Sequence, residues 1–171
     1  MENIERISEL FGMLCNSYTD SPLGKKVAQK VFYFFERKGI NLNLRYGIHF
    51  FGPYSARLDN TMHILESEDR LSIDTSHATH VITLDADTVT SGVLSPEEKK
   101  IADFVLEKFS HKTAFELEAL ATMDFVANTM LCTNKKDEII SKFIEIKGDK
   151  FNTSTIEKTY KTLVTMELIA A

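Results

Sequence analysis

The chain has 171 residues, a length that suits one domain or two small subdomains. Hydrophobic residues make up 43% and charged residues 26%, which is the composition of an ordinary globular protein. The net charge of −5 argues against a strongly basic nucleic-acid binder.

Two helices are predicted at the start of the chain. Apolar residues recur every three or four positions between residues 4 and 14 and predict an amphipathic helix. Ser21-Pro22 has the pattern of an N-cap followed by a first helical residue, so a second helix is expected from this point. Gly39 suits the position just after a helix, so the second helix should end near Lys38.

An aromatic run, Tyr46–Ser55, joins a predicted strand to a predicted helix. Apolar residues at spacing two between Leu42 and Ile48 indicate a short strand with one buried face. Gly52-Pro53 ends it, because glycine can take a positive φ and proline presets a helical φ while lacking an N–H. Proline also suits a first helical position, so we expect a third helix over about residues 53–67.

A β hairpin is predicted next. Leu71–Ile73 and His80–Leu84 have the pattern of two strands separated by a turn, and an acidic connector follows. Three helices followed by a hairpin is the order of a winged helix-turn-helix.

The second half carries three patterns typical of helix starts. Ser95, Thr113 and Ser154 each precede a glutamate by three residues, which is the capping-box pattern. A further apolar run is closed by Gly148. The helices that these patterns predict cover about residues 96–109, 114–131, 139–146 and 154–168.

These elements predict a mainly α fold with a small β hairpin, in the α+β class. A winged-helix-like half, residues 1–90, should pack on a helical half, residues 94–171. Because the helices carry apolar stripes, we expect one shared core in a single compact domain, residues 1–171.

Several blocks of the chain resemble a known family. A lysine-rich segment ending in Val31–Phe34 precedes the block His49–Ser55, and Leu94–Lys100 and residues 112–120 follow. This order resembles the Panacea family of SocA-like, phage-associated antitoxin domains, and is most similar to its subgroup with a Phe-Gly-Pro-Tyr-Ser turn. The resemblance covers residues 21–122. It implies an antitoxin-like or adaptor-like binding role and does not identify a toxin.

Catalytic and metal chemistry find little support in the residues. His77 and His80 lie three apart near Asp85 and Asp87, but they straddle a predicted turn and the sequence fixes no third ligand. No serine or cysteine lies in a nucleophile motif, and no glycine-rich loop could cradle a phosphate. We therefore expect a protein that is not an enzyme, with no cofactor and no metal.

A protein partner is the favoured prediction for the aromatic run, because tyrosine and arginine are enriched at binding hot spots. Phe50 and Phe51 cannot face the same side of a strand, so we expect one to pack inside and the other to pack against the second half. The predicted partner-binding residues, which should line a groove for a toxin or another macromolecule, are Tyr46, His49, Tyr54, Ser55 and Arg57.

A winged-helix transcriptional regulator is the alternative. Residues 22–58 carry seven basic side chains and one acid, so a local basic face is possible. However, the predicted recognition helix carries Asp59 and Glu66, and acids are repelled by phosphates. The residues predicted to contact DNA are Lys25, Lys26, Lys30 and Arg37.

A cytoplasmic location is expected. The first residues, Met1–Glu5, are acidic and do not resemble a signal peptide, and no apolar run approaches membrane-spanning length. Cys15 and Cys132 lie in apolar helical patterns, so we expect buried free thiols, although the sequence leaves a disulfide open.

Overall fold

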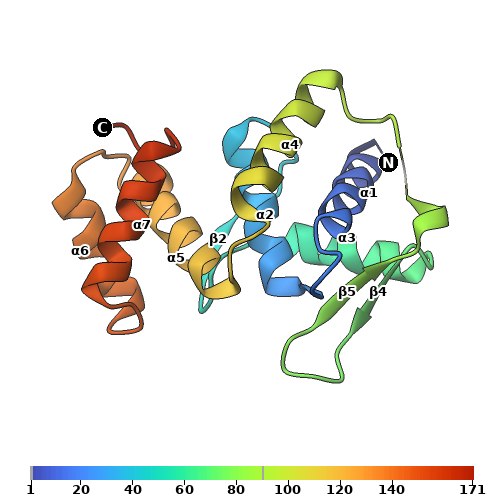
Figure 1. Ribbon diagram of the computed structural model, residues 1–171, viewed down its shortest axis with the longest axis horizontal. Coiled ribbons are helices and arrows are strands. Elements are labelled where there is room, and N and C mark those ends of the chain that lie inside the picture. The colour runs from blue at the N-terminus through green and yellow to red at the C-terminus, as the bar shows by residue number, and fades with distance from the viewer. Residues whose placement is uncertain (1, 90) are drawn as a thin grey trace. The chain divides into compact units, whose positions relative to one another are not determined.

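The computed structural model describes residues 2–89 and 91–171, and it is mainly helical with small antiparallel sheets (Figure 1). The chain divides into two compact units. One unit comprises Met1–Gly47 and Tyr54–Lys112, and the other comprises Ile48–Pro53 and Thr113–Ala171. The short segment Ile48–Pro53 therefore belongs with the C-terminal unit, although the N-terminal unit surrounds it in the sequence.

The N-terminal unit has the element order and strand pairing of a winged helix. Its three-stranded antiparallel sheet has the order β1-β5-β4, and Ile82 on β5 lies opposite both Leu23 on β1 and Ile73 on β4. Helices α1 and α3 contact this sheet (Figure 1). The elements of this unit are α1 (Glu2–Asn16), β1 (Leu23–Gly24), α2 (Lys25–Lys38), α3 (Ala56–Ser67), β4 (Leu71–Asp74), β5 (Val81–Leu84), the 3-10 turn η1 (Ala86–Thr88) and α4 (Pro96–Phe109).

Phenylalanine rings fill the core of this unit. Phe34 on α2 stacks on Phe109 on α4, with ring centroids 3.9 Å apart and an angle of 9° between the ring planes. Phe32 packs against Phe11 of α1 with centroids 4.5 Å apart. All four side chains are fully buried. Helix α4 thus lies in the N-terminal unit, whereas the sequence had placed residues from 94 onward in the second half.

The start of the second helix was predicted wrongly. Helix α2 begins at Lys25, not after Ser21-Pro22, because Leu23–Gly24 forms strand β1 instead. This strand pairs with β5, and the Lys25 N–H donates to the carbonyl of His80 at 2.8 Å. Pairing with a strand far away in the sequence therefore overrides the local helix-start pattern.

The Gly-Pro pair does not begin a helix either. Pro53 lies in β3 (Gly52–Tyr54), which pairs with β2 (Gly47–His49) to form a two-stranded hairpin. Helix α3 begins at Ala56, and Ser55 is its N-cap because the Ser55 hydroxyl accepts from the Leu58 N–H at 3.0 Å. The predicted turn is present, but the chain makes a hairpin before the helix starts.

The C-terminal unit is helical around α5, which contacts both α6 and α7 (Figure 1). Its core includes Phe143 and Phe151, whose ring centroids lie 5.5 Å apart. Its helices are α5 (Ala114–Phe125), the π-helical turn η2 (Val126–Met130), α6 (Lys136–Lys147) and α7 (Thr153–Thr165). Within the described part of the chain, no helix is both long and apolar enough to cross a membrane.

Two of the three predicted capping boxes are confirmed. The boxes that begin at Ser95 and Thr113 are both complete. The box predicted at Ser154 is wrong, because α7 begins earlier and the Asn152 side chain accepts from the Thr155 N–H at 2.8 Å.

The two cysteines are both free, and they differ in exposure. Cys15 is half-buried, and burial raises the pKa of its thiol to about 11. Cys132 is exposed, so the prediction that it is buried was wrong. It lies just after the π-helical turn, where the helix has ended, and has a positive φ of 49°.

Candidate interaction surface

The tip of the β2–β3 hairpin presents two phenylalanines. Phe50 is 80% exposed and Phe51 is 38% exposed. Their rings meet edge to face, with centroids 4.9 Å apart. The prediction that one ring packs inside was wrong, because neither ring is buried. The expected contact with the second half is present, since the Lys150 ammonium lies near both rings.

A buried lysine holds the backbone of this tip. Lys147, on α6, donates from Nζ to the carbonyl oxygen of Phe50 at 2.9 Å and to Oε1 of Glu118 at 2.6 Å. The Lys147 side chain is only 4% exposed. Because breaking a hydrogen bond to a buried charged group is costly, the position of Phe50 is coupled to the packing of α5 and α6.

A second lysine joins the same carboxylate. Lys150 Nζ lies 2.8 Å from both carboxylate oxygens of Glu118, on α5. Burial alone would raise the pKa of Glu118, but the hydrogen bonds from Lys147 and Lys150 lower it below its ordinary value. The Glu118 side chain is 8% exposed and remains ionised at neutral pH.

The hairpin also fits closely against α5 at Gly52. This residue has φ of +90°, and a Cβ atom here would lie 2.5 Å from Oγ1 of Thr122. The Thr122 hydroxyl is buried and has no hydrogen-bond partner among the residues that the structure describes. Both the backbone conformation and the available space therefore require glycine.

Lys150 connects the exposed rings of Phe50 and Phe51 to two further phenylalanines, Phe151 and Phe115. Lys150 Nζ lies 5.2 Å from the ring centroid of Phe51 and 5.9 Å from those of Phe50 and Phe151, within the range of cation–π attraction. The Phe115 ring lies 4.5 Å from Phe151 and is 45% exposed as a residue. We name Phe50, Phe51, Phe115 and Lys150 the aromatic–lysine surface.

Of the predicted partner-binding residues, Ser55 is fully buried. Its hydroxyl donates to the carbonyl of Leu44 at 2.6 Å, and its backbone exchanges two hydrogen bonds with the Gln29 side chain. Ser55 therefore positions α3 and is not accessible to a partner.

Tyr46 and Tyr54 are bonded within the N-terminal unit. The Tyr46 hydroxyl donates to the carbonyl of Gln29 at 3.0 Å, and burial, followed by the charge of Glu36, raises its pKa well above the usual range. Burial and a hydrogen bond to Asp59 raise the pKa of Tyr54 to about 12. Both hydroxyls thus stabilise the fold.

His49 and Arg57 are both exposed. His49 lies on β2, and Arg57 lies in the first turn of α3, where its guanidinium donates to the carbonyl of Asn43 at 3.0 Å. Of the five predicted groove residues, Ser55 is thus buried, the two tyrosines are half-buried, and His49 and Arg57 are exposed.

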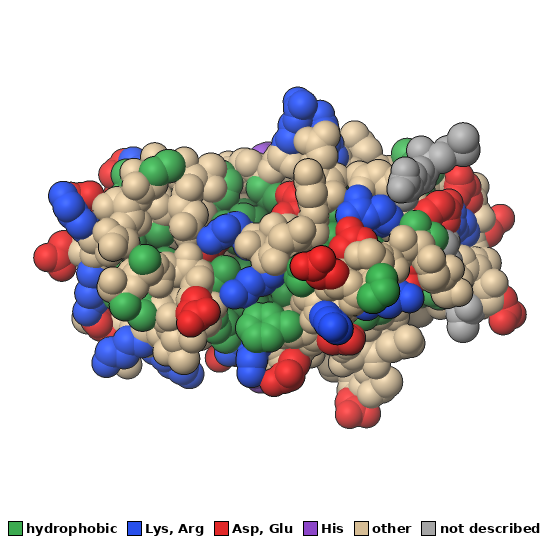
Figure 2. Space-filling view, turned by 90° about the horizontal axis from the view of Figure 1, so that it is seen from above, with side chains coloured by type: hydrophobic (Ala, Val, Ile, Leu, Met, Phe, Trp, Pro, Cys, Tyr) green, Lys and Arg blue, Asp and Glu red, His purple; other side chains and the backbone are tan. Residues whose placement is uncertain are grey.

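The predicted nucleic-acid contacts do not form one exposed cluster. Lys30 is 3% exposed, and Lys25 forms an ion pair with Asp59 of α3. Lys26 is exposed and Arg37 is half-buried. On the face drawn in Figure 2, Lys and Arg side chains are interspersed with Asp and Glu side chains.

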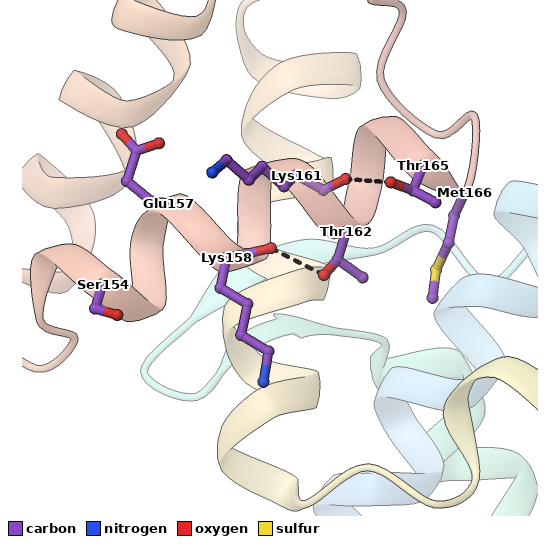
Figure 3. Close-up of a pocket in the computed structure, with 7 residues that line it drawn as sticks. All are labelled: Ser154, Glu157, Lys158, Lys161, Thr162, Thr165 and Met166. Carbon is purple, nitrogen blue, oxygen red and sulfur yellow. Dashed lines mark hydrogen bonds between the residues drawn. The ribbon is translucent and has the colours of Figure 1, made fainter.

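A groove of about 480 Å³ runs along α7 (Figure 3). Its threonine hydroxyls are used within the helix, since Thr162 donates to the carbonyl of Lys158 and Thr165 to that of Lys161. The Lys158 and Lys161 side chains point in different directions (Figure 3). The polar groups of this groove therefore do not converge on one ligand position. The residues that line it are Ser154, Glu157, Lys158, Lys161, Thr162, Thr165 and Met166.

The predicted histidine pair lies on the surface. His77 and His80 are both exposed, in and next to the β4–β5 turn. Over residues 2–89 and 91–171, no group of three or more His, Cys, Asp or Glu side chains is placed to hold a metal ion.

No protein-family model and no curated protein matches this chain. The resemblance to the Panacea family stays a prediction.

The residues that form the site were mostly not found from the sequence. Glu118, Lys147 and Lys150 lie on α5, at the end of α6 and just beyond it. In the sequence they look like ordinary solvated charges. The one local signal was Gly52, whose required conformation marks the close approach of the hairpin to a neighbouring element.

Proposed function

We propose that this chain is a non-catalytic protein-binding module, antitoxin-like or adaptor-like, which captures its partner with the aromatic–lysine surface. The observation that supports this most is Phe50, which is 80% exposed although Lys147 fixes the carbonyl of the same residue. Exposed aromatic patches often mark binding sites, and a partner that covers these rings gains their hydrophobic burial. Because the backbone of the tip is already held, little conformational freedom is lost on binding.

The Panacea-like order of motifs over residues 21–122 supports a toxin as the partner, in a phage-associated setting, or another macromolecule captured in the same way. In that family-based proposal, His49–Ser55 is the segment of greatest interest. The tip residues Phe50 and Phe51 lie inside it.

Site-specific photo-crosslinking tests the proposal. The photoreactive residue p-benzoylphenylalanine replaces Phe50 in one variant and Phe104 in a matched control. Phe104 is also an exposed phenylalanine, and it lies near the ammonium groups of Lys38 and Lys108, but on α4. After irradiation in the native host, we expect a discrete crosslinked protein from position 50 and none from position 104. No product at position 50, or the same products at both, contradicts the proposal.

A DNA-binding regulator is the second candidate, and the sheet order β1-β5-β4, with three helices before the β4–β5 hairpin, favours it. This support is an analogy of fold. The burial of Lys30 and the pairing of Lys25 with Asp59 oppose it, because phosphate contacts need accessible cations.

A mobility-shift titration across salt separates the two candidates. Binding to DNA should weaken steeply as the salt concentration rises, because counterions are released from the phosphates. We expect no shift of duplex DNA even at low salt. A salt-sensitive shift that Lys26→Gln weakens would favour the regulator.

A further inference from the structure

We propose that Lys150 forms a carboxylate subsite within the aromatic–lysine surface, so that the partner presents an acidic side chain next to a large apolar one. This inference rests on the proposed function and specifies the chemistry of the partner segment.

The cluster around Glu118 has more positive than negative charges. Two ammonium groups, those of Lys147 and Lys150, share this one carboxylate. The Glu118 and Lys147 side chains are 8% and 4% exposed, so water screens this group of charges weakly. One positive charge is left over at the edge of a partly desolvated site, and a second carboxylate would balance it.

Only one of the two lysines can receive that carboxylate. Lys147 is enclosed and divides its hydrogen bonds between Glu118 and the carbonyl of Phe50. The Lys150 side chain is 34% exposed, and its ammonium donates to both carboxylate oxygens of Glu118. An ammonium has three donors, so Lys150 can bond to a second carboxylate from the solvent side without releasing the first.

The rings determine what accompanies the acid. Phe50, Phe51 and Phe151 lie within 6 Å of the Lys150 ammonium. A partner that covers the exposed rings with an apolar side chain also excludes water from the ammonium, and the ion pair strengthens as the local dielectric constant falls. The apolar and acidic contacts therefore support each other.

A lysine among phenylalanines suits a side-chain carboxylate of a protein better than nucleic acid. Repeated phosphates need a row of cations, whereas this surface offers one accessible ammonium. A basic partner segment would be repelled by the unbalanced charge, which gives selectivity as well as attraction.

Peptide selection followed by binding measurements tests the inference. Phage-displayed random dodecamers are selected on the wild-type chain and counter-selected on Phe50→Ala. We expect the enriched peptides to contain Asp or Glu close to a large apolar residue. A chosen peptide and its amide isostere, with Asp or Glu replaced by Asn or Gln, are then titrated by interferometry.

On the wild-type chain we expect the isostere to bind about tenfold more weakly, because a charge-assisted hydrogen bond is lost. This difference should disappear on Lys150→Gln and persist on Lys142→Gln, a control lysine that pairs with Glu145 on α6. Because the isostere comparison on the wild-type chain needs no variant, it remains informative even if Lys150→Gln perturbs folding.

The outcomes separate this inference from the proposed function. If the selected peptides depend on Phe50 but the isostere binds equally well, or if neutral or basic peptides are enriched, the carboxylate subsite is refuted and the binding surface stands. If no peptide depends on Phe50, both are refuted. If the difference in affinity between the peptide and its isostere is lost equally on Lys150→Gln and Lys142→Gln, the subsite is also refuted. The difference would then depend on the net charge of the chain and not on Lys150.

Discussion

Replacing Glu118 with glutamine probes the group that anchors the hairpin tip. The substitution keeps the size of the side chain and removes the one carboxylate that Lys147 and Lys150 share. The two ammonium groups then face each other without a counter-charge. Lys147 is 4% exposed and cannot reach water by a small movement.

The structure sets the expected magnitude. Removing one partner of a buried ion pair costs about 3–5 kcal/mol, because the other charge is left uncompensated. Lys150 is one-third exposed and can turn toward water, so the cost should lie near the lower end of this range, at about 3 kcal/mol. Glu145→Gln is the matched control. Its partner Lys142 is one helical turn earlier on the surface of α6, and such exposed pairs contribute about 0.5 kcal/mol or less.

Urea unfolding followed by far-ultraviolet circular dichroism measures both variants, since the chain has no tryptophan to report by fluorescence. Adding Lys147→Met to the wild-type chain and to each variant completes two double-mutant cycles. We expect Glu118 and Lys147 to be coupled by about 1–3 kcal/mol, and Glu145 and Lys147 to be additive.

A cost for Glu118→Gln similar to that of Glu145→Gln, together with a coupling near zero, would refute the reasoning. The two lysines would then be ordinary surface charges. The fixed position of the Phe50 carbonyl would need another cause.

Three further outcomes are expected. Gly52→Ala should destabilise the chain by about 2 kcal/mol or more, because of the strained positive φ and the clash with α5. In the control Gly47→Ala the added Cβ meets no atom within 4 Å, so the urea midpoint should change little. The folded-state pKa of Glu118 is lowered from 4.5, so the stabilisation from this carboxylate is present above pH 4.5 and is lost as the pH falls through the folded-state pKa. The difference in unfolding free energy between wild type and Glu118→Gln should therefore narrow below pH 4.5 and stay constant at higher pH. In a thiol-labelling time course near neutral pH, the exposed Cys132 should react first and Cys15, with its pKa raised to about 11, much more slowly; equal rates would contradict the assigned burial.

Local sequence rules predicted much of the fold. The Ser95 and Thr113 boxes depend on residues three apart, so the sequence contains the whole interaction. The β4–β5 hairpin is local in the same sense. Strand β1 could not be found in this way, because its two residues are extended only by pairing with a strand nearly sixty positions later.

The candidate site depends on contacts between residues far apart in the sequence, so local patterns could not predict it. Lys147 and Lys150 reach Glu118 across 29 and 32 positions, and Lys147 reaches the Phe50 carbonyl across 97. The aromatic run does contain the turn that carries the candidate surface. Within it, Ser55 and Tyr46 proved to be structural, and the exposed rings proved to be the two phenylalanines expected to pack.

The most direct test of the binding surface compares partner capture by Phe50→Ala and Phe104→Ala, once crosslinking has identified the partner. Both substitutions truncate an exposed ring, so both variants should melt within a few degrees of the wild-type chain. We expect Phe50→Ala to weaken the partner by about thirtyfold or more, as truncation of a hot-spot aromatic does, and Phe104→Ala to leave its affinity unchanged. Equal affinities for wild type and Phe50→Ala would contradict the account.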